Sequence, residues 1–165
     1  MNINEILKSG EVVRYHSNPH IANQKLCEHE WKVALLLQRF YPNCSKNALL
    51  VALTHDAAEM YTGDAPSPAK KRSPELKTLL DRLEEQFNED LGIKFDISKE
   101  EEYNIKNCDI LEGLVYTATR IINHGEKLAI ECFEKWCDYY RSRVTTLEMD
   151  DFVIPFILAV EKEFK

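Results

Sequence analysis

The stretch Leu53–Lys71, LTHDAAEMYTGDAPSPAKK, has His55, Asp56 and Glu59 within five residues, and Asp64 follows soon after them. In an α-helix, residues three and four apart share a face, so Glu59 would converge with His55 and Asp56 on one edge. A cluster of charged residues on a helix is usually a solvated face. The neighbouring apolar residues decide whether this edge faces solvent or the core.

The apolar residues of this segment recur at helical spacing and predict one helix over residues 46–62. Ser45 is a good N-cap, and Gly63 suits the C-terminal cap. We expect the face next to the charged cluster to be buried, and it is formed by Leu49, Ala52, Leu53 and Met60. Two carboxylates and an imidazole beside a core are costly unless something compensates their charge. A divalent cation is the economical solution.

The chain supplies two further ligands for such a cation. His29 lies on the preceding predicted helix, residues 26–41, and the short connection predicts that the two helices pack as antiparallel neighbours. Asp109 lies in the apolar-rich stretch IKNCDILEGLVY. Alone, each has a common structural explanation, a core histidine bonded to a backbone carbonyl or an aspartate bonded between helices. With His55 and Asp56 they supply two nitrogens and two carboxylates, which suit Zn²⁺, Mn²⁺, Co²⁺ or Fe²⁺.

The rest of the chain is also predicted to be helical. Caps such as the Ser98–Glu101 capping box mark helix starts, and residues 64–73, with two prolines, predict a loop. Trp31 and Trp136 are expected to anchor the core. We find no convincing strand pair. The sequence therefore predicts an all-α protein, a single compact bundle over residues 1–165, with helices at 26–41, 46–62, 74–91, 98–123, 126–143 and from 149 to the C-terminus.

Composition excludes several classes of protein. The net charge of −7 over 165 residues argues against a protein that wraps a nucleic-acid polymer. The sequence has no run of eighteen apolar residues that would predict a membrane span, and its first residues do not form a secretory signal. The five cysteines are odd in number and form no CxxC pair, so we expect reduced thiols in a cytoplasm.

The spaced order H…HD…D resembles the HD-domain superfamily of metal-dependent phosphohydrolases, which are all-helical. More narrowly, four segments resemble the small HD-domain deoxynucleotidases: RYHSNP at Arg14, CEHEWKVA around His29, HDAAEMYTGDAPSPAKK from His55 and NCDILE around Asp109. That group includes bacterial 5'-deoxynucleotidases of the YfbR type and phage dATP triphosphohydrolases of the DatZ type. The similarity runs in matching order over roughly residues 5–120, and the C-terminal third matches only in being helical.

This resemblance implies a role for each matching position. It implies that a divalent metal, Zn²⁺, Mn²⁺ or Co²⁺ with Mg²⁺ also suitable, is bound by His29, His55, Asp56 and Asp109. It implies that Glu59 and Asp64 assist proton transfer and orient water. It implies that Arg14 holds phosphate, and Lys70 lies where the family often has a basic residue near the phosphates. Tyr15 and His16 follow Arg14 and are expected to contact the sugar or base.

The leading prediction is a metal-dependent enzyme that dephosphorylates deoxynucleotides. Bacterial monophosphate enzymes tend to have Arg-Trp-Pro where this chain has Arg14, Tyr15 and His16, which favours the phage-like dATP triphosphohydrolase. A 5'-deoxynucleotidase acting on monophosphates is the alternative. A cyclic-nucleotide or (p)ppGpp hydrolase is disfavoured by the short chain. A metal-stabilised helical interaction module would explain the ligands but not Arg14, Glu59 and Asp64. The resemblance also suggests a homo-oligomer.

Overall fold

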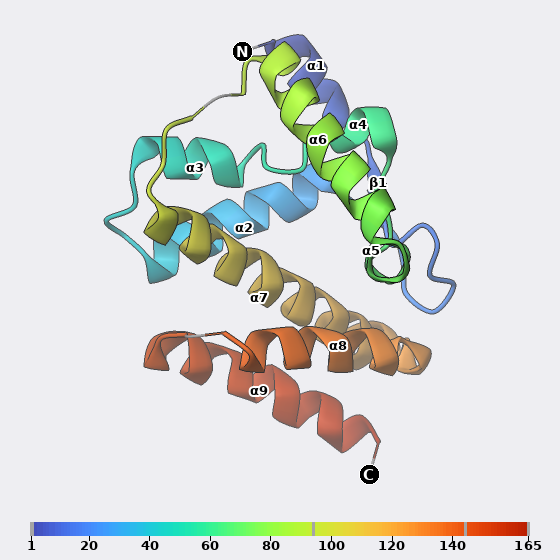
Figure 1. Cartoon of the computed structure of the whole chain (residues 1–165). Helices are drawn as coiled ribbons and strands as arrows, with labels where there is room; N and C mark the ends of the chain where they lie inside the picture. The colour runs from blue at the N-terminus through green and yellow to red at the C-terminus, as the bar shows by residue number, and fades with distance from the viewer. Residues whose placement is uncertain (1, 94, 144, 165) are drawn as a thin grey trace.

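The computed structural model describes residues 2–93, 95–143 and 145–164, which are mainly helical, so the predicted all-α class is confirmed (Figure 1). The helices are α1 Ile3–Ser9, α2 Leu26–Phe40, α3 Lys46–Ala52, α4 Glu59–Thr62, α5 Ser67–Arg72, α6 Pro74–Leu91, α7 Lys99–His124, α8 Ile130–Arg141 and α9 Leu147–Glu163, with a 3-10 turn, η1, at Lys127–Ala129. A two-residue antiparallel ladder joins β1, Val13–Arg14, to β2, Gln24–Lys25.

The long helix α7 crosses the middle of the molecule and contacts α2 and α3 on one side and α8 and α9 on the other (Figure 1). Its start is the predicted capping box, in which the Ser98 side chain accepts the Glu101 N–H and the Glu101 carboxylate accepts the Ser98 N–H. It ends at Gly125, whose positive φ of 68° is a conformation that glycine adopts without strain. Because of this central position, α7 places side chains both against α2 and α3 and against α8 and α9.

Two apolar clusters pack against α7. The larger lies between α7, α8 and α9 and includes Leu114, Phe133 and Val153. The smaller joins α2, α3 and the first part of α7, through Leu37, Ala52 and Cys108 among others. Cys108 and the four other cysteines are free. Within the described ranges, no helix is long and apolar enough to cross a membrane.

The predicted helix over residues 46–62 is wrong in its middle. The chain leaves α3 at Ala52, and residues 53–58 form successive turns before α4. The backbone N–H groups of Ala57 and Glu59 donate three residues back, to Thr54 and Asp56, instead of four. The Thr54 hydroxyl also donates to the Leu50 carbonyl at 2.7 Å, and such local bonds compete with helix geometry. As a result Leu53, expected on the buried face, is 41% exposed.

Other boundaries also differ from the sequence prediction. Residues 67–72 of the predicted loop form α5, in which Pro68 lies in the first turn, where a missing N–H costs no helical bond. The predicted helix over 126–143 is divided into η1 and α8. Helix α9 starts at Leu147 and continues through Pro155. Neither α1 nor the β1–β2 ladder was predicted, since elements this short leave little periodicity.

Trp31, expected to anchor the core, is 57% exposed on α2. The prediction fails because the buried stripe of α2 follows Leu26, His29, Val33 and Leu37, and Trp31 lies off that stripe. Trp136 is half-buried against the α7–α8–α9 cluster. Adding a β-carbon at Gly113 would bring it within 2.7 Å of the Trp136 ring, so the glycine gives the indole room against α7.

Candidate metal centre and its surroundings

Three separate segments bring His29, His55, Asp56 and Asp109 together. His29 comes from α2, the adjacent pair from the turns after α3, and Asp109 from α7. The Nε2 of His29 lies 3.3 Å from Oδ1 of Asp109 and 3.8 Å from Oδ2 of Asp56. The Nε2 of His55 lies 3.5 Å from Oδ2 of Asp56. One ligand atom each from His29, His55 and Asp109 lies within 4.8 Å of the others, so the group is compact enough to surround one ion.

Hydrogen bonds to the Nδ1 atoms of His29 and His55 orient both imidazole rings so that Nε2 faces this cluster. The Nδ1 of His29 lies 2.8 Å from Oε2 of Glu112, and the Nδ1 of His55 lies 3.0 Å from the Ala52 carbonyl. A carboxylate and a carbonyl only accept, so each Nδ1 donates and each neutral ring keeps its Nε2 lone pair. Both Nε2 atoms are buried and have no hydrogen-bond partner among the described residues. Two such nitrogens facing carboxylate oxygens fit a divalent metal that accepts mixed ligands.

The charges of the cluster are mutually dependent. Burial opposes ionisation of Asp56 and Asp109, but the neighbouring imidazoles outweigh it and lower both pKa values, with Lys106 adding to the effect on Asp109. Burial and Arg14 oppose protonation of His29, while Asp109 and Glu112 raise its pKa to about 9. A positive charge at the centre is therefore favoured, whether a proton or a metal ion supplies it.

Arg14 forms one wall beside this cluster. The register of the ladder places Arg14 opposite Gln24, and Nη1 of Arg14 donates to Oε1 of Gln24 over 3.2 Å. The guanidinium is largely buried and lies 3.7 Å from Oε2 of Glu112. Burial disfavours its charge, but Tyr15 and the nearby carboxylates raise the pKa of Arg14 above its ordinary value. A permanently charged, planar donor thus lies next to the candidate metal ligands.

Tyr15 has a strained backbone. Its φ of 62° is in the left-handed region, which non-glycine residues rarely adopt, and its N–H donates to Oδ2 of Asp64 over 3.2 Å. The ring stacks on Tyr116, with 5.3 Å between the centroids. The Tyr15 hydroxyl is buried without a partner in the described part of the chain. The next side chain, His16, is exposed. The two residues expected to contact sugar or base therefore point to different surroundings.

Glu59, Asp64 and Lys70 lie around the same centre. Burial and the charges of Asp56 and Asp64 raise the pKa of Glu59 to about 9, and its Oε2 is buried without a hydrogen-bond partner in the described ranges. Asp64 is half-buried and holds the Tyr15 backbone, a contact that the sequence did not indicate. Lys70, half-buried on α5, is close enough to Glu59 to favour its charged form.

Several charged residues near the cluster were missed by the sequence argument. Lys106 donates to Oδ2 of Asp109 over 2.5 Å, and burial with the nearby Asp56 raises the pKa of Glu30 to about 8. Glu112 contacts His29. The signal was their spacing: Lys106 and Glu112 stand three residues before and after Asp109, and Glu30 follows His29.

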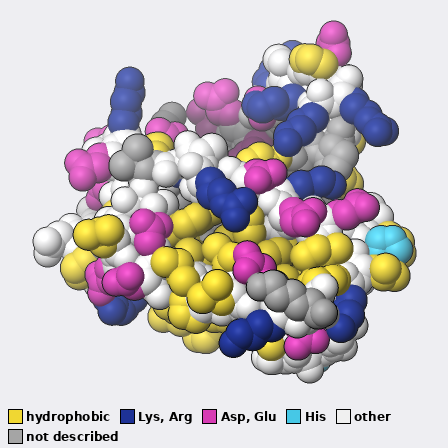
Figure 2. Space-filling model, turned by 90° about the horizontal axis from the view of Figure 1, so that it is seen from below, with side chains coloured by type: hydrophobic (Ala, Val, Ile, Leu, Met, Phe, Trp, Pro, Cys, Tyr) yellow, Lys and Arg dark blue, Asp and Glu magenta, His cyan; other side chains and the backbone are white. Residues whose placement is uncertain are grey.

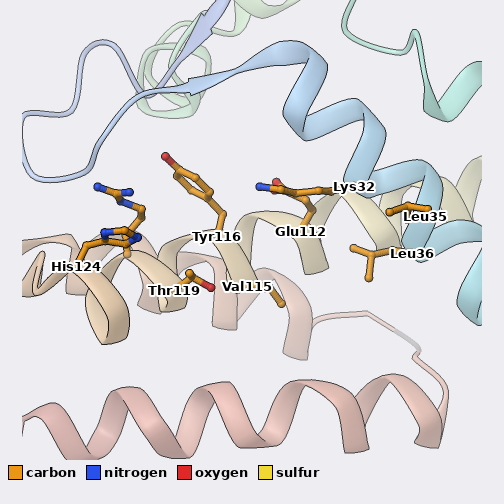
Figure 3. Close-up of a pocket in the computed structure, with 9 residues that line it drawn as sticks. Lys32, Leu35, Leu36, Glu112, Val115, Tyr116, Thr119 and His124 are labelled. Carbon is orange, nitrogen blue, oxygen red and sulfur yellow. The ribbon is translucent and has the colours of Figure 1, made fainter.

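A shallow groove of about 410 Å³ lies between α2 and α7 and borders this network (Figure 3). In Figure 3, Lys32 extends from α2 toward Glu112 on α7, and Tyr116 stands one turn further along α7. The Nζ of Lys32 lies 3.5 Å from Oε1 of Glu112. The remaining lining is mostly apolar, so Glu112 joins the groove to the His–Asp cluster.

Comparison with known proteins agrees with this geometry. A family model described as 5'-deoxynucleotidase YfbR-like matches residues 5–135. The chain is 31% identical over 119 residues to a dATP triphosphohydrolase of Cyanophage S-2L. The matched region covers 68% of this chain and 67% of the phage protein. It is 27% identical over 169 residues to a 5'-deoxynucleotidase of Photorhabdus laumondii, covering 87% and 86% of the two chains.

Among solved structures, the chain resembles the Cyanophage S-2L HD phosphohydrolase DatZ bound to dA and one catalytic Zn²⁺ ion. The TM-score is 0.68, the sequence identity is 26%, and the match covers 98% of both chains. The resemblance thus includes the C-terminal helices, which the sequence motifs did not reach.

Proposed function

The chain belongs to the 5'-deoxynucleotidase YfbR-like family, and from this premise we propose that it is a metal-dependent phosphohydrolase of deoxynucleotides. The proposal rests on the two buried Nε2 atoms of His29 and His55, which have no hydrogen-bond partner among the residues that the structure describes. They face Asp56 and Asp109 beside the guanidinium of Arg14. A metal and a phosphate would be held side by side. We propose that residues 1–165 act as one HD domain and that it works in the cytoplasm.

We assign metal binding to His29, His55, Asp56 and Asp109, with Zn²⁺ as the first candidate because the DatZ structure contains a catalytic Zn²⁺. Mn²⁺, Co²⁺ and Mg²⁺ remain candidates. When bound, such an ion polarises a phosphoryl oxygen and makes water more acidic. The tautomers set by Glu112 and the Ala52 carbonyl present the two nitrogens that this ion requires.

The chain's own residues would supply the rest of the chemistry. Arg14 holds a phosphate through its planar donors, and Lys70 adds positive charge from α5. Glu59, in a setting that favours its protonated form, can donate a proton to the leaving oxygen. Asp64 fixes the Tyr15 backbone, which keeps Arg14 in place, and it remains our second candidate for orienting water.

For the substrate we propose dATP, or deoxynucleoside triphosphates more generally, with release of the deoxynucleoside. The Cyanophage S-2L relative, 31% identical to this chain, is named a dATP triphosphohydrolase, and the solved DatZ structure was bound to dA. A 5'-deoxynucleotidase acting on monophosphates is the second candidate, because that is what the Photorhabdus relative is named. Contacts from Tyr15 and His16 would select the sugar or base.

A panel of dATP, dGTP, dCTP, dTTP, ATP and dAMP, each with Zn²⁺, Mn²⁺, Co²⁺ or Mg²⁺, tests this proposal by chromatography of the products. The proposal predicts that dATP is turned over to deoxyadenosine and that ATP is a poor substrate. Rapid turnover of dAMP, with no turnover of dATP, would instead identify the protein as a 5'-deoxynucleotidase acting on monophosphates. No turnover of any member of the panel with any metal would contradict the proposal.

We also propose that the enzyme is a homo-oligomer that pairs through α9. Figure 2 shows the face on which α9 lies, with hydrophobic side chains gathered across its middle. Helix α9 exposes Ile154 and Leu158, which are four residues apart and therefore share one face of the helix. Lys162 stands between Glu161 and Glu163 in the last turn, so we expect apolar burial, not charge pairing, to hold two copies together.

Light scattering on the full chain tests this pairing. We expect an oligomer that Leu158→Glu converts to a monomer, while Leu7→Glu, an equally drastic change at an exposed leucine of α1, leaves it intact. A monomeric parent protein would refute the pairing.

A further inference from the structure

Glu112 lies at the centre of a chain of hydrogen bonds that begins at Arg14 and ends at His29. Arg14 donates to Oε1 of Gln24, and Nε2 of Gln24 donates to Oε1 of Glu112 over 2.7 Å. His29 donates to the other oxygen of Glu112 over 2.8 Å. The side chains of Gln24 and Glu112 are almost completely buried. The candidate phosphate ligand and a candidate metal ligand therefore share one buried carboxylate.

The direction of every bond in this chain is fixed by chemistry. Arg14 and the His29 Nδ1–H have only protons to give, so Gln24 must present its oxygen to Arg14 and its amide protons to Glu112. Glu112 must then accept from both sides, which only an ionised carboxylate does without loss. An apolar or protonated residue at position 112 would free the His29 ring to rotate or change its tautomer.

We propose that Glu112 is a positioning residue that fixes His29 for the metal and, through Gln24, fixes Arg14 for the phosphate. The inference rests on the proposed function, since it assigns a role within the same site. It explains why a buried carboxylate lies in contact with Lys32, Arg14 and His29. A buried charge of this kind costs stability, which a role in the site justifies.

An exchange of two side chains isolates the hydrogen bonds from the charge. In Glu112→Gln one of the two carboxylate oxygens becomes an NH₂ group, so either Gln24 or His29 meets a donor instead of an acceptor. Turning the Gln24 amide over would place its NH₂ group against the Arg14 guanidinium, so one mismatch remains. In the double variant Gln24→Glu with Glu112→Gln, the carboxylate at position 24 accepts from Arg14 and from the amide at position 112, whose oxygen accepts from His29. Every bond is restored and the net charge of the pair is unchanged.

The experiment measures Zn²⁺ affinity of the full-length variants by competition with a chelating dye, together with KM for dATP at saturating Zn²⁺. Glu112→Gln should bind Zn²⁺ roughly 10- to 100-fold more weakly, the range typical of such supporting residues. It should also raise KM by about tenfold, the size expected when a bond to a charged group is lost. The double variant should recover both values.

Glu126→Gln is the matched control, because Glu126 also joins α7 to other segments, through Arg120 and the Ala22 N–H, but lies away from the cluster. It should leave Zn²⁺ affinity and KM unchanged. Circular dichroism identifies a single variant that loses zinc only because it is unfolded, and the double variant then carries the test.

Two results would overturn the inference and leave the proposed function standing. One is an unchanged Zn²⁺ affinity in folded Glu112→Gln. The other is a folded double variant that binds Zn²⁺ as weakly as the single variant. Absence of Zn²⁺ binding in the parent protein, with no turnover of dATP, would overturn both.

Discussion

The two halves of α7 bury very different side chains. Around Asp109 and Glu112 the helix carries charges that contact α2 and the β1–β2 ladder, whereas from Leu114 to Ile121 it packs apolar side chains against α8 and α9. The apolar half contributes stability through burial. The polar half keeps charges in the interior that a purely structural core would replace by apolar residues, often at no cost. The difference indicates that the second half of α7 serves the fold, whereas the first half combines apolar packing with the charges of the site.

The largest effect should follow from removing a carboxylate of the His–Asp cluster that the polar half of α7 faces. Asp56→Asn should lower dATP turnover by roughly a thousandfold or more, because the metal supplies several kcal/mol of transition-state stabilisation. The helical content should be unchanged, since Asp56 lies in the turns between α3 and α4 and not within a helix. Steady-state kinetics and circular dichroism measure both. Retained turnover would remove Asp56 from the site.

Glu59→Gln should separate catalysis from metal binding. We expect turnover to fall by about 10²- to 10⁴-fold, the usual contribution of a proton donor or acceptor. Zinc content should stay at the level of the parent protein, because Glu59 is not among the assigned ligands. Metal analysis alongside kinetics checks this prediction, and a loss of zinc would make Glu59 a ligand instead.

The apolar half should behave in the opposite way. Leu114→Ala should destabilise the protein by about 2 to 5 kcal/mol, because Leu114 is fully buried and its truncation leaves a cavity. At a temperature where the variant is folded, kcat should be close to that of the parent. Leu147→Ala, at a leucine that is 83% exposed, is the control and should leave stability within about 0.5 kcal/mol. A loss of kcat in folded Leu114→Ala would contradict the assignment of a purely structural role to the apolar half of α7.

The smallest effect concerns the start of α7, which both halves need. Hydrogen bonds from Ser45 and Ser98 lower the pKa of Glu101 to about 2. Because the folded-state pKa is depressed, the stabilisation is present above pH 4.5 and is lost as the pH falls toward 2. Glu101→Gln should therefore melt slightly below the parent at pH 7, and the difference should shrink at pH 3. An equal difference at both pH values would contradict the assignment.

The apolar half was the easier one to predict from the sequence. Helical spacing and caps located α2, α6 and α7 closely, because periodicity directly reflects a one-sided burial. Residues 53–58 were assigned wrongly to a helix, since no local signal distinguishes successive turns from one. The ligand types were nonetheless recognisable, because two carboxylates beside two imidazoles are the wrong composition for a core. The turns over residues 53–58 bring His55 next to His29, and the spacing of residues in the sequence does not predict such turns.

Glu112 was missed for a different reason. Its position three residues after Asp109 was a weak signal, because a surface position explains a glutamate on a long helix equally well. Its role depends on Gln24 and Arg14, which lie on a two-residue ladder 88 and more residues away along the chain. Contacts of that separation come from tertiary packing alone.

Titration of the metal-free protein with Zn²⁺ by calorimetry tests the central assignment most directly. We expect one ion per chain for the parent protein and for Leu114→Ala, and no tight binding in a variant carrying His55→Ala and Asp109→Ala. Tight binding of one ion by that double variant, or none by the parent protein, would contradict this assignment.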